Sequence, residues 1–311
     1  MKEENNGNSL KPENRQNILP HQNIFHHQKP LKKKPIFWRK LKAGMMETLS
    51  LVVLAVTLGG MGWILASLLQ EGASVISWSF LTEPSKPYGV PNGGIGNALV
   101  GTLLITLTAA VITVPVAVAG GIYLAEFGKG TRLANAIRFC ANVMMGIPSI
   151  VVGLFIYAVY VIPTGHFSGF AGSLALGVIM LPLIMRTTED MLLLVPDTQR
   201  EAALALGMTR MRATLAIICR CARGGLATGI LMALARVSGE TAPLLFTALW
   251  SNTWCDRFFT APTANIPVLM TEYTTNSPFQ ELHAAGWGAA LVIMACILVL
   301  NVTVKVLCKT N

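Results

Sequence analysis

The strongest constraint on the fold is a series of apolar runs that contain no Asp, Glu, Lys or Arg and are long enough to cross a lipid bilayer. The longest run covers residues 139–185, more than twice the length of about 20 residues that one helical crossing requires. Hydrophobic residues make up 53% of the chain and charged residues only 13%, so a soluble domain is a poor alternative. The sequence predicts an all-α membrane protein that crosses the bilayer several times.

Turn residues and charges divide these runs into six predicted transmembrane helices. The segment 163–169 contains Pro and Gly and splits the longest run into two crossings. Residues 1–44 are rich in Asn, Gln, His, Lys and Pro, and we expect a disordered basic tail ahead of a transmembrane domain at 45–308. The six predicted spans are 48–69, 96–125, 139–162, 170–186, 224–249 and 284–304, and a polar loop covers 187–223.

The distribution of basic residues predicts the orientation in the membrane. With six crossings, 21 of the 24 Lys and Arg residues lie on the side of the two termini, and only Lys86 and Arg257 lie on the other side. Cytoplasmic segments carry the excess of Lys and Arg in membrane proteins. We therefore expect cytoplasmic termini and a cytoplasmic 187–223 loop. The net charge of +9 is explained by this asymmetry and does not indicate nucleic-acid binding.

The polar loop contains a predicted short helix at 196–207. Thr198 and Glu201 have the spacing of a capping box, and Gly207 suits a left-handed stop. A helix of about two turns is marginal in water and needs a surface to hold it. That surface is either a partner or the protein itself, and the local pattern alone favours the protein itself. The small apolar face of the helix consists of Ala202, Ala205 and Leu206.

Span five contains the only ionisable residues that interrupt a predicted span, Arg236 and Glu240. A charge at the bilayer centre costs about 2.5–3.5 kcal/mol, so neither side chain should face lipid. Four residues apart, they are expected to share a helix face and to neutralise each other. They form either an ion pair that locks helix packing or a polar lining for a charged solute. Gly239 and Pro243 predict that the helix is broken at this point.

The sequence contains no pattern typical of catalysis or metal binding. It lacks a phosphate-cradling glycine loop, a nucleophile with a neighbouring base, and metal-ligand spacing of the usual kinds. Cys219 and Cys221 have no further ligands nearby, and the six cysteines do not predict a disulfide framework. We expect no enzyme activity, no catalytic residue, no cofactor and no metal site in this chain. Any energy that drives it comes from elsewhere.

The polar helix resembles the cytoplasmic "EAA" loop of permease subunits of binding-protein-dependent ABC importers. The match consists of Glu201, Ala202 and Ala203, then Gly207, then Ile217 ten positions later. In that family this helix couples to a groove on the ATP-binding subunit. The family pattern usually closes with Leu-Pro where this chain has Cys219 and Arg220, so its exit from the loop differs.

Within that family, residues 45–308 resemble the PstA-type phosphate permeases. The resemblance rests on segments 93–95 with 101–103, 121–127, 146–155, 181–189 and 236–248. It implies a type I ABC importer permease fold in the bacterial inner membrane. It also implies an ATP-driven phosphate importer in which this permease works with a homologous permease, two ATP-binding subunits that bind the ATP, and a periplasmic phosphate-binding protein. The implied ATPase-docking residues are Glu201, Ala202, Ala203, Leu206 and Gly207, and the implied translocation residues are Arg236, Gly239, Glu240 and Thr241.

Three other interpretations remain open from the sequence. The chain is a sister permease or a paralogue for another oxyanion, or an ion-coupled secondary carrier with Glu240 as its proton site, or a membrane scaffold in which the buried pair is structural. The docking helix and the lack of an internal sequence repeat argue against the carrier.

Overall fold

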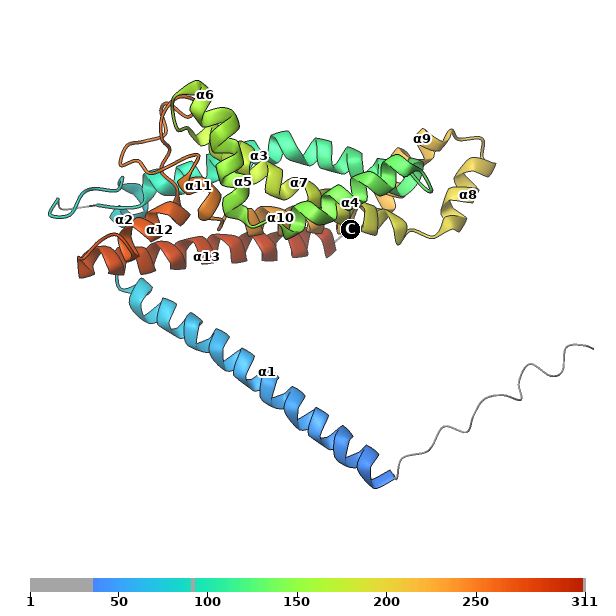
Figure 1. Cartoon of the computed structure of the whole chain (residues 1–311), viewed down its shortest axis with the longest axis horizontal. Coiled ribbons are helices and arrows are strands. Elements are labelled where there is room, and N and C mark those ends of the chain that lie inside the picture. Colours follow the sequence, from blue (N-terminus) through green and yellow to red (C-terminus); the bar gives the residue numbers. More distant parts are fainter. Residues whose placement is uncertain (1–35, 91–92, 310–311) are drawn as a thin grey trace, which may run out of the picture. The chain divides into compact units, whose positions relative to one another are not determined.

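The computed structural model describes residues 36–90 and 93–309, and all regular elements in these ranges are helices (Figure 1). Residues 1–35 of the predicted tail lie outside the described part. The chain divides into two compact units between Gly62 and Trp63. This division falls inside α1 (Ile36–Ala73), whose segment Lys40–Ala73 is long and apolar enough to cross a membrane.

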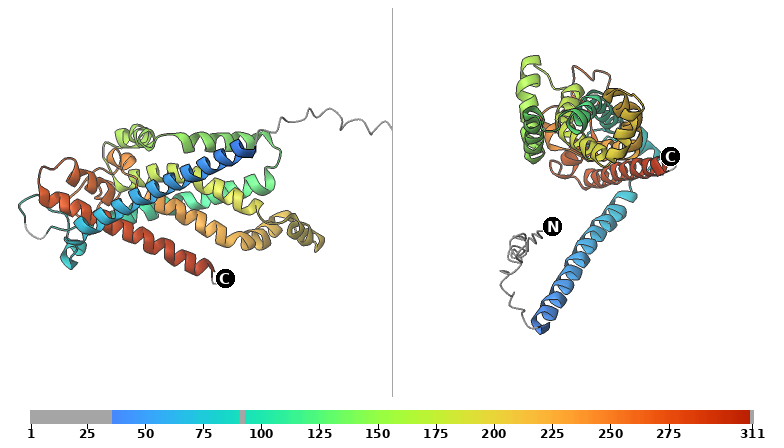
Figure 2. Two further views of the ribbon diagram at one scale, coloured as in Figure 1. Left: turned by 90° about the horizontal axis from the view of Figure 1, so that it is seen from below. Right: turned by 90° about the vertical axis from the view of Figure 1, so that its right-hand side faces the viewer.

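The second unit is built around α3 (Gly96–Ile122) and α7 (Gly169–Leu193), which pack along their length. The helix α10 (Cys219–Val237) packs on α7 with the opposite chain direction, and α13 (Gln280–Lys309) packs on α10, with their axes roughly along those of α3 and α7 (Figures 1 and 2). The main core lies between α3, α7 and α10 and includes Ile105, Leu176, Met180 and Val237. Beyond Ile122, α3 continues as a π-helical turn, η1 (Tyr123–Phe127).

The predicted third span, 139–162, is two helices and not one. The helix α4 (Arg132–Gly146) ends at Ile147, and α5 (Ser149–Ile156) continues through η2 (Tyr157–Val161) to α6 (Ile162–Thr164). The two halves are bent by 103°. Pro148 explains the bend, because proline has no N–H to donate and drives the preceding residue into extended geometry, which Ile147 adopts.

The fifth helix also differs from the predicted span 224–249. The apolar helical segment runs from Arg210 through α9 (Arg210–Ala213) and η3 (Thr214–Ile218) to the end of α10 at Val237. The chain then turns and forms the short α11 (Ala242–Leu245). The helix begins before the predicted span because arginine is a good helix former, so the charges between 210 and 223 limit the apolar run without ending the helix.

Among the described residues, five helices are long and apolar enough to cross a membrane, or six if the bent pair counts as one. The all-α membrane fold is therefore confirmed. The limits of each span within the lipid stay a prediction.

A buried polar network organises the end of the second unit that is distant from the 187–223 loop (Figure 1). Asn97 is fully buried; it accepts the Ser85 backbone N–H at 3.0 Å and donates to the carbonyl oxygens of Ser251 and Thr253 at 3.2 and 3.3 Å. These bonds attach two long loops to the first turn of α3. They satisfy a buried amide, which would otherwise cost about 1–3 kcal/mol.

The same end is held by α2 (Trp78–Thr82) and α12 (Ile266–Thr274). The Ile266 backbone N–H donates to the Thr102 hydroxyl on α3 at 2.8 Å. On the same side of α3, Gly101 lies directly against the carbonyl oxygen of Ala264. Glycine allows this approach because a side chain at position 101 would occupy the place of that oxygen.

Candidate functional site

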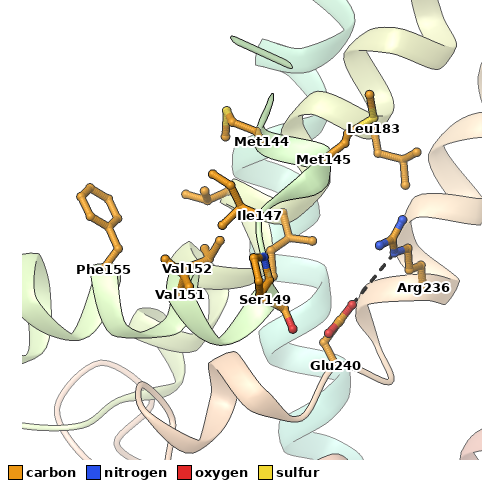
Figure 3. A pocket seen from close by; sticks show the side chains of 13 residues that line it. Met144, Met145, Ile147, Ser149, Val151, Val152, Phe155, Leu183, Arg236 and Glu240 are labelled. Carbon is orange, nitrogen blue, oxygen red and sulfur yellow. Dashed lines mark ion pairs between the residues drawn. The ribbon is translucent and has the colours of Figure 1, made fainter. Parts of the chain in front are cut away.

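A pocket of about 420 Å³ opens where the α4–α5 bend faces α7 and the end of α10 (Figure 3). Most of its lining is apolar and includes Met145, Val152, Phe155, Ile179 and Leu183. Arg236 and Glu240 bring the only formal charges of the lining, and Ser149 adds a hydroxyl. The bend and the end of α10 thus combine charged and apolar groups in one cavity.

The contact between Arg236 and Glu240 is loose. Arg236 Nε lies 4.0 Å from Glu240 Oε1, and the side chains are 60% and 21% exposed. That separation is too long for a hydrogen bond, so Glu240 leaves the donors of Arg236 available to another acceptor. The prediction that both residues share a helix face is wrong, because α10 ends at Val237 and Glu240 lies beyond it.

Gly239 and Thr241 lie in the same break between α10 and α11, but neither lines the pocket. Thr241 precedes α11, and its carbonyl oxygen accepts the backbone N–H groups of Leu244 and Leu245 at 3.1 Å. The break predicted from Gly239 and Pro243 is confirmed by the ends of these helices. Of the four predicted translocation residues, the structure therefore brings Arg236 and Glu240 to the pocket.

Sequence reasoning missed the contribution of α5 to this pocket. Ser149 opens α5, and it lines the same pocket as Glu240 (Figure 3). Further along α5, a Cβ on Gly153 would lie 2.6 Å from Pro243 Cα, so α5 sits directly on α11. The signal in the sequence was Pro148 inside the charge-free run, which marks the bend that positions α5.

The predicted docking helix is α8 (Asp197–Ala205), with Pro196 at its N-cap. No side chain caps it, so the predicted capping box of Thr198 and Glu201 is wrong. The helix begins one residue before Thr198, which places that hydroxyl inside the first turn, where it cannot act as the cap. The left-handed stop is confirmed, since Gly207 has a φ of +79°.

The predicted docking residues of α8 do not all face outward. Glu201, Ala202 and Gly207 are exposed, and Leu206 is 82% exposed. Ala203 is only 1% exposed because it packs on the protein itself. The exposed set is available to a partner, whereas Ala203 supports the helix from behind.

The part of the chain that forms this site matches a known protein family. The model of the family described as "Binding-protein-dependent transport system inner membrane component" matches residues 117–309 of the chain. That segment contains the docking helix, the bend and the pocket. The chain belongs to this family of inner membrane components.

The curated relatives of this inner membrane component include phosphate transport system permease proteins named PstA. The chain is 42% identical to the protein of Yersinia pestis, with 89% of this chain and 93% of that one aligned. It is 41% identical to the protein of Haemophilus influenzae (86% and 93% aligned) and 36% identical to the probable one of Methanocaldococcus jannaschii (91% and 98% aligned). The resemblance to PstA-type permeases is confirmed.

Among solved structures, the inner membrane component is similar in fold to a chain of the MetNI methionine ABC transporter in an inward facing conformation. The TM-score is 0.58 at 17% sequence identity, with 70% of this chain and 95% of that chain covered. The type I ABC importer permease fold is thereby confirmed. Family membership makes the chain a multi-pass inner membrane protein and a transport permease that works with other transporter subunits.

Two buried carboxylates of this inner membrane component lie near the 187–223 loop, and neither was singled out from sequence. Glu189, on α7 and 2% exposed, accepts from Arg138 Nε at 2.6 Å and from Arg186 Nη1 at 3.1 Å. Glu126, in η1 and 3% exposed, accepts from Arg200 of α8 at 2.7 Å. Their sequence signal is weak, because the partners of each pair lie up to 74 positions apart.

Proposed function

We propose that the chain is a permease subunit of an ATP-driven inorganic phosphate importer. The observation that carries this proposal is Arg236, placed in a largely apolar pocket with its hydrogen-bond donors free of Glu240. The names of the curated relatives, all phosphate transport permeases, support phosphate as the solute. We assign Arg236, Gly239, Glu240 and Thr241 to the translocation path, with Gly239 and Thr241 shaping the break that presents the charged pair.

A guanidinium suits an oxyanion chemically. It stays charged at any physiological pH and offers a planar fork of N–H donors that fits two phosphate oxygens. The apolar walls of the pocket lower the local dielectric constant and strengthen that attraction. Glu240, close by but not hydrogen-bonded, weakens it, which allows the anion to leave again. Ser149 offers one further hydroxyl donor in the lining of the same pocket (Figure 3).

Coupling to ATP requires a separate surface, and we assign it to α8. Glu201, Ala202, Leu206 and Gly207 form an exposed set that fits a groove on an ATP-binding subunit, with Ala203 fixing the helix from the inside. The full assembly contains a homologous permease, two ATP-binding subunits and a periplasmic phosphate-binding protein. ATP binding draws the coupling helices together and turns the cavity outward, and hydrolysis resets it. The excess of Lys and Arg supports cytoplasmic termini.

The test is uptake of labelled phosphate into vesicles that contain this chain with its neighbouring subunits. ATP and the binding protein are added or omitted independently. Uptake that requires both establishes the proposed function. Uptake driven by a proton gradient without ATP replaces it with the carrier interpretation, and transport of a different oxyanion corrects the solute.

Glu201→Lys is expected to lower copurification of the ATP-binding subunits about tenfold, because it reverses an exposed charge at the proposed docking surface. The measurement is the ratio of ATP-binding subunit to permease after affinity purification. The matched control is Glu281→Lys, an equally exposed carboxylate in the first turn of α13, which should leave that ratio unchanged. Unchanged copurification together with unchanged uptake in Glu201→Lys would remove α8 as the docking surface.

A further inference from the structure

We propose that Arg200 and Glu126 are positioning residues that join α8 rigidly to α3, so that movement of the docking helix reaches the pocket. This inference rests on the proposed ATP-driven function and adds the contact that transmits the movement of α8 to the transmembrane helices. The helix α8 is short and follows α7 after residues 194–196, so a docked subunit moves the transmembrane helices only through the contacts that α8 makes with them. A rigid connection is needed between the docking surface and the bundle.

Arg200 provides that connection through every donor of its side chain. Its Nε and Nη2 donate to Glu126 Oε1 at 3.0 and 2.7 Å. Nη1 also donates to the carbonyl oxygen of Val195 at 2.6 Å, and Nη2 to that of Leu192 at 2.7 Å. A last bond reaches Asp197 Oδ1 at 3.0 Å. One guanidinium therefore ties α8 to the end of α7 and to the end of α3.

Glu126 lies in a segment whose backbone carbonyl groups also accept hydrogen bonds from side chains. It lies in η1, where the π-helical turn interrupts the regular ladder and leaves carbonyl groups for other partners. The Glu126 carbonyl oxygen accepts from Arg210, whose guanidinium also lies 5.4 Å from the centre of the Phe127 ring. The Leu124 carbonyl oxygen accepts from Arg138 on α4 at 2.9 Å. Segments on both sides of Gly207 are thus attached to η1.

The energetics of the pair favour a geometric role over a stabilising one. Glu126 is 4% exposed and Arg200 14% exposed by side chain, so both charges have lost much of their water. The Coulomb attraction in a buried pair often does no more than offset this desolvation. The hydrogen bond to Glu126 raises the pKa of Arg200 above its ordinary value, so the guanidinium keeps its charge in this contact.

The contacts of Arg200 are connected to the pocket through α7. The carbonyl groups of Leu192 and Val195, which Arg200 holds, lie at the end of α7. Two turns or more earlier, α7 lines the pocket through Val178, Ile179 and Leu183. Helices α3 and α7 pack along their length, so a displacement of α8 shifts both as a body.

The first experiment uses the complete transporter with Glu126→Gln, which keeps the size of the side chain and removes its charge. We expect the ATP-binding subunits to copurify normally and ATP hydrolysis to stay within about twofold, while phosphate uptake falls about tenfold. The number of ATP molecules hydrolysed per phosphate moved then rises accordingly. The control is Asp197→Asn, which removes only the charge of the 77% exposed partner of the same guanidinium and should leave this ratio unchanged.

The second measurement follows the distance between α8 and the end of η1. The native cysteines are first replaced, and spin labels are then attached at Lys129→Cys, after η1, and at Leu204→Cys, on α8. Both positions line one small pocket together with Arg200. The distance between the labels should stay constant on ATP binding in the parent chain and should change in Glu126→Gln. A distance that changes already in the parent chain overturns the inference.

Equal loss of hydrolysis and uptake in Glu126→Gln also overturns it, because that result indicates a role in folding or docking alone. An unchanged number of ATP molecules hydrolysed per phosphate moved in Glu126→Gln overturns it as well. Failure of the proposed function is distinguishable from these results, because the parent complex would then show no ATP-dependent phosphate uptake at all.

Discussion

Arg236→Gln is expected to lower phosphate uptake about hundredfold while the complex still assembles. Glutamine keeps a polar but shorter side chain and removes the permanent charge and the two-pronged donor. Arg236 is the one cation among the residues that line the pocket, so no other lining side chain supplies a positive charge to the anion after the substitution. The loose contact with Glu240 at 4.0 Å means that the bundle loses little packing energy. Uptake by vesicles containing the whole transporter measures the effect.

Two further variants separate charge from geometry in that experiment. Arg236→Lys retains the positive charge without the planar fork and should lower phosphate uptake about tenfold. Arg257→Gln removes an exposed cation outside the pocket and should leave uptake within about twofold, since surface charges contribute little. If Arg236→Gln abolished assembly of the complex, the pair with Glu240 would be structural and the proposed path would be wrong.

Gly101→Ala is expected to disrupt the end of the bundle that is distant from the 187–223 loop. A Cβ at position 101 would clash directly with the carbonyl oxygen of Ala264, and it would lie 3.2 Å from Cys255 Sγ. The nearest obstacle is backbone, so the loop before α12 must move away from α3 and strain its bond between Ile266 and Thr102. Overpacking of this severity costs about 3 kcal/mol or more, which lowers the thermal midpoint by about 10 °C. Thermal unfolding of the purified permease in detergent gives the shift.

The matched control for Gly101→Ala is Gly224→Ala. Gly224 lies in α10, and a Cβ there would meet nothing within 4 Å. Since alanine is the better helix former by about 0.5–1 kcal/mol, the control should leave the thermal midpoint unchanged or raise it. A Gly101→Ala protein with the parent thermal midpoint would show that the close approach of Ala264 to α3 is not needed for folding.

The membrane fold could be predicted because it follows from local composition. Each apolar run carries its own cost of exposure to water, so a run such as 139–185 predicts membrane helices whatever its neighbours are. The count of up to six crossings agrees with that reasoning. The left-handed stop at Gly207 and the helix break near Gly239 were equally local, since each depends on the backbone freedom of one or two residues.

Predictions that relied on helix continuity were less successful. Arg236 and Glu240 were placed on one helix face because their spacing suits it, yet α10 ends between them. The same reasoning treated 139–162 as one span; Pro148 bends it by 103°, and it counts as one candidate crossing when the two halves are taken together. In both cases a proline or glycine weakens the helix, but the surrounding packing decides where the chain leaves it. The contact of Gly153 with Pro243 is part of that packing.

Residue types and short spacings were enough to predict the membrane class, the family and a cation inside predicted span five, because none of these depends on contacts between distant segments. Only the tertiary structure decided which groups meet. It brings Ser149 to the pocket of Arg236, places Ala203 inward and pairs Arg200 with Glu126. The physical reason is that a buried ion pair or a pocket depends on distances between segments far apart in the chain, and these are set by the packing of whole helices.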